Sequence, residues 1–300
     1  MSDHKEAKSF SRFGYIMVAA GAAIGLGNIW KFPYLAYGDG GGAFVLIYIV
    51  ICILLGHPIV QAEQAVGRRG RASAAASYGV IHPKWRFVGV INIVCTFLID
   101  IYYLVVSGWV LKYFVTYVVS GDFGKDKQAY FDNYISSTTQ PLIYSLIIIA
   151  IIVFFLFFGI TNIVEKASKV IMPMLAVLLL VCGIYALIVV PGAVDGLKYY
   201  FVPDFSQFGM QQFADACMQV CFSVGIGWGI FTTLGASMDK DANLKADAWW
   251  VDICDTFIAL LAGFVIIPTV VGTGSEMSSG PSLVFVAMTQ IFETLPGGRI

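Results

Sequence analysis

The chain has 300 residues, of which 58% are hydrophobic and 12% are charged, and its formal net charge is −1. Soluble domains carry about 25% charged residues, so this chain has too few polar side chains to cover a surface that faces water. The composition therefore argues against a soluble enzyme and predicts an integral membrane protein with the lipid bilayer as its surroundings. The near-neutral charge gives no basic field, so no nucleic-acid partner is expected.

Apolar segments follow one another along the whole chain, and each is long enough to cross a bilayer as a helix. Polar loops separate the segments, the longest of them at 120–140. We therefore predict an all-α integral membrane protein with about seven transmembrane helices in a single domain, residues 1–300. The segments lie at about 13–37, 42–67, 88–119, 141–160, 168–190, 211–238 and 246–272.

Lysines and arginines set the predicted orientation, because they concentrate in cytoplasmic loops. With a cytoplasmic N-terminus, 12 of these residues lie inside and 4 outside. We predict a multi-pass protein of the plasma (inner) membrane with its N-terminus in the cytoplasm. The inside residues are Lys5, Lys8, Arg12, Arg68, Arg69, Arg71, Lys84, Arg86, Lys166, Lys169, Lys240 and Lys245, and the outside residues are Lys125, Lys127, Lys198 and Arg299.

Two segments, the first and the sixth, hold glycines clustered at mid-depth. Glycine costs about 1 kcal/mol per residue inside a helix, and unwound backbone within a membrane survives where it lines a cavity or is buried in protein. Polar side chains flank both clusters, which favours interrupted helices over the alternative, close packing of helices through small residues. The clusters are Gly21, Gly25 and Gly27, and Gly225, Gly227 and Gly229.

A matched pair of interrupted spans indicates a binding site near the membrane midplane in transporters built from inverted repeats. The first and sixth spans correspond in a fold of two five-helix repeats. We place the first repeat at about 10–190 and the start of the second at about 211–300. No clear internal sequence repeat supports this division, so the symmetry is an inference.

Four stretches of sequence are more specific. Residues 21–34 read GAAIGLGNIWKFPY, 38–44 read GDGGGAF, 219–229 read QVCFSVGIGWG and 255–264 read DTFIALLAGF. In this order they closely resemble the neurotransmitter:sodium symporter family, over essentially the whole chain. The resemblance implies a leucine-transporter-type inverted-repeat bundle that takes up a small amino-acid substrate with sodium by alternating access. It also implies four or five further helices, so we expect this chain to be a partial one.

The resemblance implies two sodium sites, with Na⁺ as the coupling ion and no organic cofactor. Sodium prefers oxygen ligands. The first site would use the Ala23 carbonyl and the side chains of Asn28, Ser223 and Asp255, and the second, partial site would use carbonyls of Gly21 and Ile24. Many members have asparagine where this chain has Asp255. We hypothesise that this acid supplies the negative charge that chloride supplies elsewhere, the alternative being a protonated acid packed between helices.

The implied substrate site also lies at the breaks. Backbone N–H groups of Leu26 and Gly27 and the Tyr103 hydroxyl suit a carboxylate, and carbonyls of Ala23, Phe222 and Ser223 suit an ammonium group. Gly25 stands where monoamine carriers have aspartate, which favours an amino acid that brings its own carboxylate. The side-chain pocket would be walled by Ile99, Tyr103, Phe222 and Trp228, with Gly225 leaving space, and would favour a hydrophobic or aromatic amino acid.

Lys31 and Arg12 match the family's outer and inner gate positions, although Lys31 replaces the usual arginine and cannot make its planar two-point contact. Asp100 lies beside the predicted pocket, and the sequence assigns it no role. A sodium-dependent sensor or a channel-like protein on the same scaffold is the alternative function. An intramembrane protease is disfavoured, because neither Asp100 nor Asp255 follows a Gly-x-Gly. The oligomeric state is not predicted.

Overall fold

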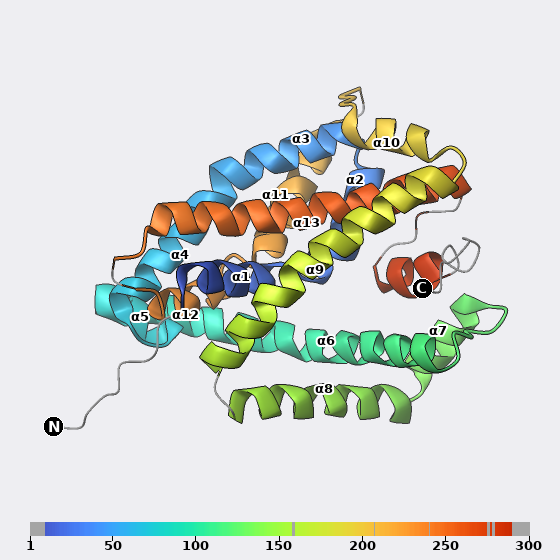
Figure 1. Cartoon of the computed structure of the whole chain (residues 1–300). Helices are drawn as coiled ribbons and strands as arrows, with labels where there is room; N and C mark the ends of the chain where they lie inside the picture. The colour runs from blue at the N-terminus through green and yellow to red at the C-terminus, as the bar shows by residue number, and fades with distance from the viewer. Residues whose placement is uncertain are drawn as a thin grey trace.

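The computed structural model describes residues 10–157, 160–206, 208–239, 241–274, 277 and 280–289. Within these residues the chain forms helices and no strand, and one isolated bridge joins Gly41 to Pro203. The predicted all-α fold is therefore confirmed. Long helices run lengthwise side by side, and short ones cross their ends (Figure 1).

The first half of the chain holds the broken first span, two long spans and short helices beyond them. Three short stretches depart from regular α geometry and are labelled η. The elements are α1 Arg12–Ala23, η1 Gly27–Lys31, α2 Phe32–Gly38, α3 Gly42–Ile51, η2 Cys52–Gly56, α4 His57–Gly70, α5 Ala74–Ile81, η3 Pro83–Trp85, α6 Arg86–Val119 and α7 Lys127–Ser136.

The second half contains three further uninterrupted spans, α8, α9 and α13, and a second broken helix pair, α11 and α12. The elements are α8 Thr139–Phe157, α9 Ile160–Val189, α10 Ala193–Phe201, α11 Met210–Val224, α12 Ile230–Ala236, α13 Leu244–Thr273 and η4 Leu283–Met288.

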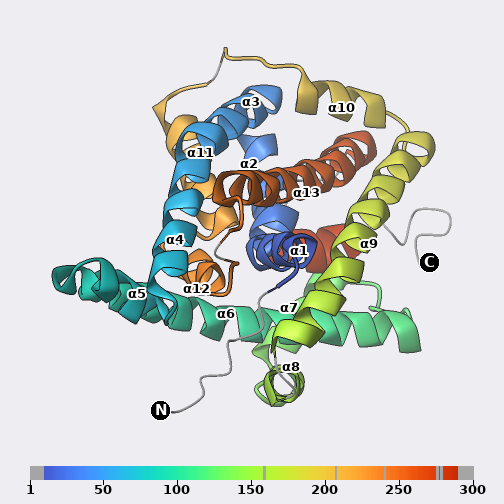
Figure 2. The same cartoon turned by 60° about the vertical axis from the view of Figure 1, so that its left-hand side comes forward.

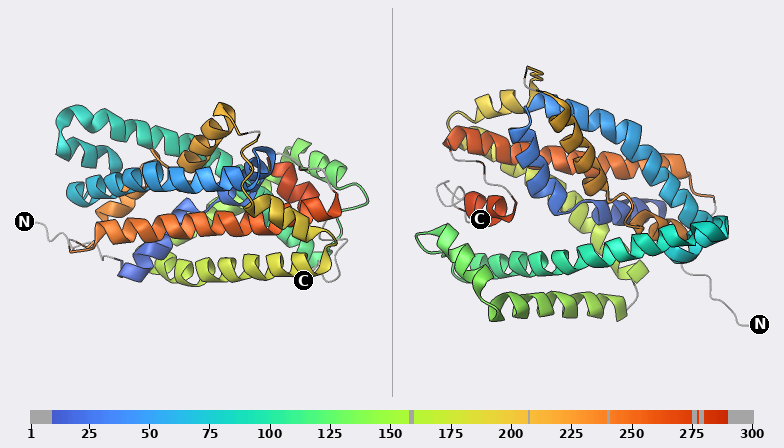
Figure 3. Two further views of the ribbon diagram at one scale, coloured as in Figure 1. Left: turned by 90° about the horizontal axis from the view of Figure 1, so that it is seen from above. Right: turned by 180° about the vertical axis from the view of Figure 1, so that it is seen from behind.

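Helix α13 occupies the middle of the bundle, between α1, α3 with α4, and α9 (Figure 2). In its most apolar stretch 67% of the residues are buried, against 11% in α6 and 6% in α8. Helices α6 and α8 lie together along one edge of the molecule (Figure 3). Their exposed side chains are largely apolar, as the lipid-facing surface of a membrane protein requires.

Within the part of the chain that the structure describes, five helices are long and apolar enough to cross a membrane, and α1 with η1 and α2 adds a sixth if this pair, bent by 61°, is read as one span. The sixth predicted span corresponds to α11 and α12. These have 15 and 7 residues and are separated at Gly225–Gly229, so neither reaches a spanning length by itself. Both predicted interruptions are present.

The region 120–140, predicted as a polar loop, contains helix α7 instead. Its N-cap Asp126 accepts a hydrogen bond of 2.9 Å from the Ala129 N–H, as aspartate does at helix starts. Phe131 is buried and packs edge-on against Trp109 of α6. The apolar residues of α7 recur every three to four positions, as on one face of a helix. Charged residues surround them, so the sequence pattern did not indicate a helix here.

Candidate functional site

The first helix break follows Ala23. Ile24 leaves the helical conformation with ψ 111°, and the chain resumes helical geometry at Gly27. The Gly25 N–H donates a 2.9 Å hydrogen bond to Oδ1 of Asn28. This side chain therefore satisfies a backbone donor that the interrupted helix leaves without its usual carbonyl.

The second break runs through Gly225, Gly227 and Gly229, whose φ angles are +72°, +81° and +71°. Glycine adopts this left-handed region without steric cost, unlike other residues. The Gly227 N–H donates a 2.8 Å hydrogen bond to Oε1 of Glu63 on α4. Glu63 therefore has a structural role, in which its carboxylate accepts a hydrogen bond from the unwound backbone.

The two breaks lie against each other. Nε2 of Gln219 on α11 donates a 3.0 Å hydrogen bond to the Gly27 carbonyl. A Cβ atom at Gly27 would stand 2.8 Å from the Phe222 ring, closer than a carbon can approach. Gly27 thus permits close contact between the helices, as well as contributing to the interrupted first span.

A buried polar cluster joins the first break to α11 and α13. Nδ2 of Asn28 donates to Oγ of Ser223 at 2.9 Å, to Oδ1 of Asp255 at 2.8 Å and to the Asp255 carbonyl at 3.2 Å. The Ser223 hydroxyl donates to Oδ2 of Asp255 at 2.8 Å. Asn28 and Asp255 are fully buried and Ser223 nearly so. No lysine, arginine or histidine among the described residues forms an ion pair with Asp255.

The chemistry of these donors fits a monovalent hard cation. One carboxylate, one hydroxyl and one amide belong to the cluster, and each carries an oxygen ligand, although the amide oxygen of Asn28 accepts from the Gly25 N–H here. The predicted fourth ligand, Ala23, is buried at the end of α1, and its carbonyl lies 3.9 Å from where a Gly25 Cβ would be. Among the described residues no group of three or more His, Cys, Asp or Glu side chains could hold a metal.

Of the two residues predicted for a second sodium site, Gly21 lies on the last turn of α1 and Ile24 is the C-cap of that helix. A Cβ at Gly21 would meet Sδ of Met172 at 3.2 Å and Oγ of Ser168 at 3.8 Å, both on α9. A hydroxyl from the fifth span therefore approaches the Gly21 backbone. Nothing in the sequence patterns indicated Ser168 as a neighbour of this position.

The predicted substrate-pocket residues gather at the first break. The Tyr103 hydroxyl is 3.3 Å from the Cβ position of Gly25. The Trp228 ring lies edge-on to Tyr103, with centroids 6.5 Å apart, and edge-on to Phe222, at 5.5 Å. A Cβ at Gly225 would touch Trp228 at 3.4 Å. Half-buried Leu26 belongs to the break itself, and half-buried Ile99 lies one turn before Tyr103 on α6.

The two predicted gate residues have different surroundings. Nε of Arg12 donates a 2.8 Å hydrogen bond to Oδ1 of Asp247 in the first turn of α13, and the Asp247 side chain is only 2% exposed. Nζ of Lys31 lies 4.6 Å above the Phe222 ring. Lys31 therefore contacts the wall of the predicted pocket, and within the described chain it forms no ion pair.

Sequence reasoning missed a buried pair formed by His57 and Asp252. Nδ1 of His57 lies 2.8 Å from Oδ2 of Asp252, and the imidazole stacks on Trp249 at 4.0 Å. His57 precedes Pro58 in an apolar segment, for which a packed histidine is the simplest interpretation of the sequence. The sequence contained one indication of this site: Asp252 and Asp255 are three residues apart, which places both acids on one face of α13.

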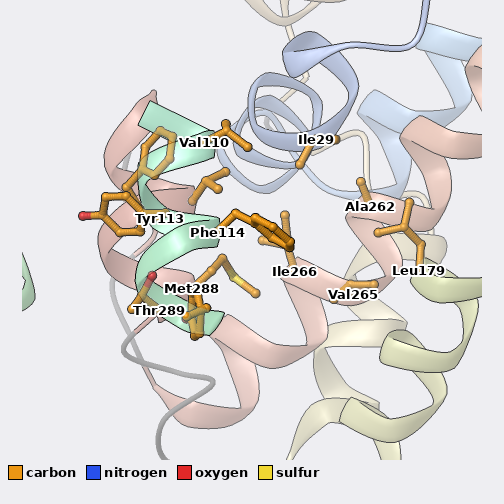
Figure 4. A pocket seen from close by; sticks show the side chains of 13 residues that line it. Ile29, Val110, Tyr113, Phe114, Leu179, Ala262, Val265, Ile266, Met288 and Thr289 are labelled. Atoms are coloured by element: carbon orange, nitrogen blue, oxygen red, sulfur yellow. The ribbon is translucent and has the colours of Figure 1, made fainter. Parts of the chain in front are cut away.

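A separate cavity of about 330 Å³ lies between α6, α13 and η4 (Figure 4). Apolar side chains such as Phe114, Ile266 and Met288 point into it, and no charged residue lines it. The convergent polar groups that orient a small polar ligand are found at the breaks instead. The helix breaks are therefore the stronger candidate site.

The chain is similar to known proteins in sequence and in fold. A family model described as the Sodium:neurotransmitter symporter family matches residues 7–121 and 131–300. An uncharacterized sodium-dependent transporter of Bacillus subtilis, YhdH, is 33% identical over 305 residues, covering 100% of this chain and 67% of the relative. One of Haemophilus influenzae is 33% identical over 304 residues, covering 96% and 66%.

Among solved structures, the crystal structure of MhsT in complex with L-phenylalanine matches with a TM-score of 0.89 and 34% identity. The match covers 98% of this chain and 68% of MhsT, and it confirms the predicted leucine-transporter-type fold. The chain spans about two thirds of the length of these relatives.

Proposed function

Because the chain belongs to the sodium:neurotransmitter symporter family, whose members are transporters rather than enzymes, we propose that it couples sodium entry to the uptake of a small amino acid by alternating access. The buried cluster of Asn28, Ser223 and Asp255 supports this proposal most directly. An ionised acid inside a membrane is costly and requires a functional or structural reason, and binding a cation provides one.

The first sodium site would use the Ala23 carbonyl and oxygens of Asn28, Ser223 and Asp255. When bound, the ion supplies positive charge that Asp255 balances and that favours a carboxylate nearby. Asp255 provides this balance from within the protein, so we propose that transport does not require chloride. Carbonyls of Gly21 and Ile24 would contribute to a second site.

The amino-acid carboxylate would bind the N–H groups of Leu26 and Gly27 and the Tyr103 hydroxyl, at the start of the helix that resumes after the break. The ammonium group would bind carbonyls of Ala23, Phe222 and Ser223. The rings of Phe222 and Trp228 next to Gly225 favour a hydrophobic or aromatic surface on the substrate side chain.

Alternating access also requires closure at both ends of the site. The Arg12–Asp247 ion pair would close the cytoplasmic side, and Lys31 beside Phe222 would belong to the outer side. We also propose the topology predicted from the sequence. Residues 1–300 form one domain in the plasma (inner) membrane, the N-terminus is cytoplasmic, and the repeats lie at about 10–190 and 211–300.

The test is uptake of labelled amino acids by proteoliposomes that contain the product of the complete gene. A sodium gradient is compared with choline, and chloride with gluconate. Asp255→Ala should abolish sodium-dependent accumulation, and Asp195→Ala, which removes a 75% exposed acid from α10, should leave it unchanged. Binding that depends on sodium without accumulation would indicate a sensor, and loss of uptake in gluconate would contradict chloride independence.

A further inference from the structure

Asp100 is an acid in the middle of α6, between Ile99 and Ile101 in a span of 37 residues. Ionisable side chains at such positions normally pair with another group, because leaving the charge unpaired in the membrane is costly. Asp100 forms no hydrogen bond or ion pair with any residue that the structure describes, and no lysine, arginine or histidine lies among its cavity neighbours. Its side chain is exposed, so the carboxylate is open to a partner other than the described residues.

Asp100 lines a cavity of about 500 Å³ between α6 and the second helix break, and it is the only charged side chain among the described residues that line it. The two threonines of the lining already use their hydroxyl protons. Thr96 donates to the Asn92 carbonyl at 2.9 Å and also to the Trp228 carbonyl, and Thr233 donates to the Gly229 carbonyl at 2.9 Å. An occupant of this cavity therefore meets one carboxylate that is ready to accept hydrogen bonds.

The cavity adjoins the proposed amino-acid pocket. Trp228 lines the cavity and is also in edge-on contact with Tyr103 and Phe222. Tyr103, whose hydroxyl faces Gly25, follows Asp100 by three residues, which is about 4.5 Å along a helix. A substrate that binds its carboxylate at the first break can thus extend its side chain past Trp228 toward Asp100.

The lining favours a cation at the end of that side chain. A carboxylate attracts an ammonium or guanidinium group, and the aromatic rings of Trp228 and Phe97 attract cations as well. The remaining walls are apolar, and they suit the methylene stem that a basic side chain carries behind its charge.

We propose that the transported amino acid has a basic side chain whose cationic end pairs with Asp100. This inference rests on the proposed sodium-coupled transport, and it replaces a wholly apolar substrate side chain with one that has an apolar stem and a positive end. Asp100 then acts as a specificity-determining residue, not as a ligand of sodium.

Lysine and norleucine provide a matched pair of probes, because they share a four-carbon stem and differ in the terminal amine. Sodium-dependent uptake of each labelled compound is measured in proteoliposomes for the wild-type protein, Asp100→Asn and Asp100→Glu. The wild-type protein should favour lysine by at least ~10-fold, Asp100→Asn should reduce that ratio by at least ~10-fold, and Asp100→Glu should retain a preference for lysine.

The norleucine arm also reports whether each variant is folded, because norleucine does not need the charge at Asp100. Equal or better uptake of norleucine by the wild-type protein would overturn the inference while leaving sodium-coupled transport intact. An unchanged ratio in Asp100→Asn would overturn it too. If neither probe nor any of the common amino acids is taken up or bound with sodium, the proposed function itself fails.

Discussion

Asn28 and Asp255 lie 227 residues apart in the chain and are joined by a 2.8 Å hydrogen bond from Nδ2 to Oδ1. The same Nδ2 group donates to Ser223, while Oδ1 of Asn28 accepts from Gly25. One amide thus connects the first helix break to α11 and α13. The NH₂ group of Asn28 donates to the same Ser223 and Asp255 oxygens that would bind a cation. For Asn28 to bind sodium, its amide must therefore turn so that its oxygen faces the ion.

Replacing Asn28 by alanine removes both this connection and an oxygen ligand. Asn28→Ala should raise the sodium concentration for half-maximal amino-acid binding at least ~10-fold, because each hydrogen bond to a charged group contributes about 1.5–3 kcal/mol. A sodium titration of ligand binding measures this. Asn133→Ala is the control, since Asn133 is an exposed asparagine on α7, outside the helix breaks. An equal shift in both variants would contradict a specific role for Asn28.

The second break gives a prediction about backbone strain alone. A Cβ atom at Gly227 or at Gly38 would meet no atom within 4 Å, but Gly227 has φ +81° and Gly38 is helical. Gly227→Ala should lower the free energy of unfolding by about 1–2 kcal/mol. Gly38→Ala should be neutral or slightly stabilising. Thermal unfolding in detergent compares the two, and equal effects would mean that the left-handed conformation does not matter.

The helix breaks were predictable because the glycine clusters, and the polar residues beside them, are local features of the sequence. The contacts between the breaks were not local. The bonds of Asn28 to Ser223 and Asp255 span 195 and 227 residues, and only the family resemblance placed these residues in one site.

Other features carried weaker signals. His57 was identified as packed, but its partner Asp252 lies 195 residues away on α13, a pairing that no periodicity encodes. Helix α7 was missed because its apolar face is short and charged residues surround it. Asp100 attracted attention as an intramembrane acid, yet its position next to Trp228 became evident only from the cavity that both residues line.

Breaking the Arg12–Asp247 ion pair, whose acid is nearly buried, should cost more stability than breaking an exposed ion pair. Arg12→Ala leaves the nearly buried Asp247 carboxylate without this partner, so it should destabilise the protein by about 1–3 kcal/mol. Lys198→Ala breaks the exposed Lys198–Asp195 pair, at 3.3 Å, and should change stability by less than about 1 kcal/mol. Melting temperatures in detergent test the order of the two effects. A larger loss in Lys198→Ala would contradict the proposed closure of the cytoplasmic side by Arg12.

Asp39, in the short loop between α2 and α3, predicts a dependence of stability on pH. Burial, together with the negative charge of Asp215, raises the pKa of Asp39 to about 6. The folded protein therefore holds this proton more tightly than the unfolded chain, in which the pKa is about 3.9. The resulting stabilisation is complete below about pH 4 and is lost as the pH rises toward about 6.

Asp39→Asn should accordingly raise the melting temperature at pH 7.5, where it removes the repulsion from Asp215, and should have little effect near pH 4. Asp204 provides a control of opposite sign. It is exposed, and a 2.9 Å hydrogen bond from the Ser206 N–H lowers the pKa of Asp204, so its contribution is present above about pH 4 and is lost as the pH falls. Asp204→Asn should therefore lower the melting temperature at pH 7.5 slightly. A lower melting temperature for Asp39→Asn at pH 7.5, or the same change at both pH values, would show that the carboxylate of Asp39 is not destabilising in the folded protein.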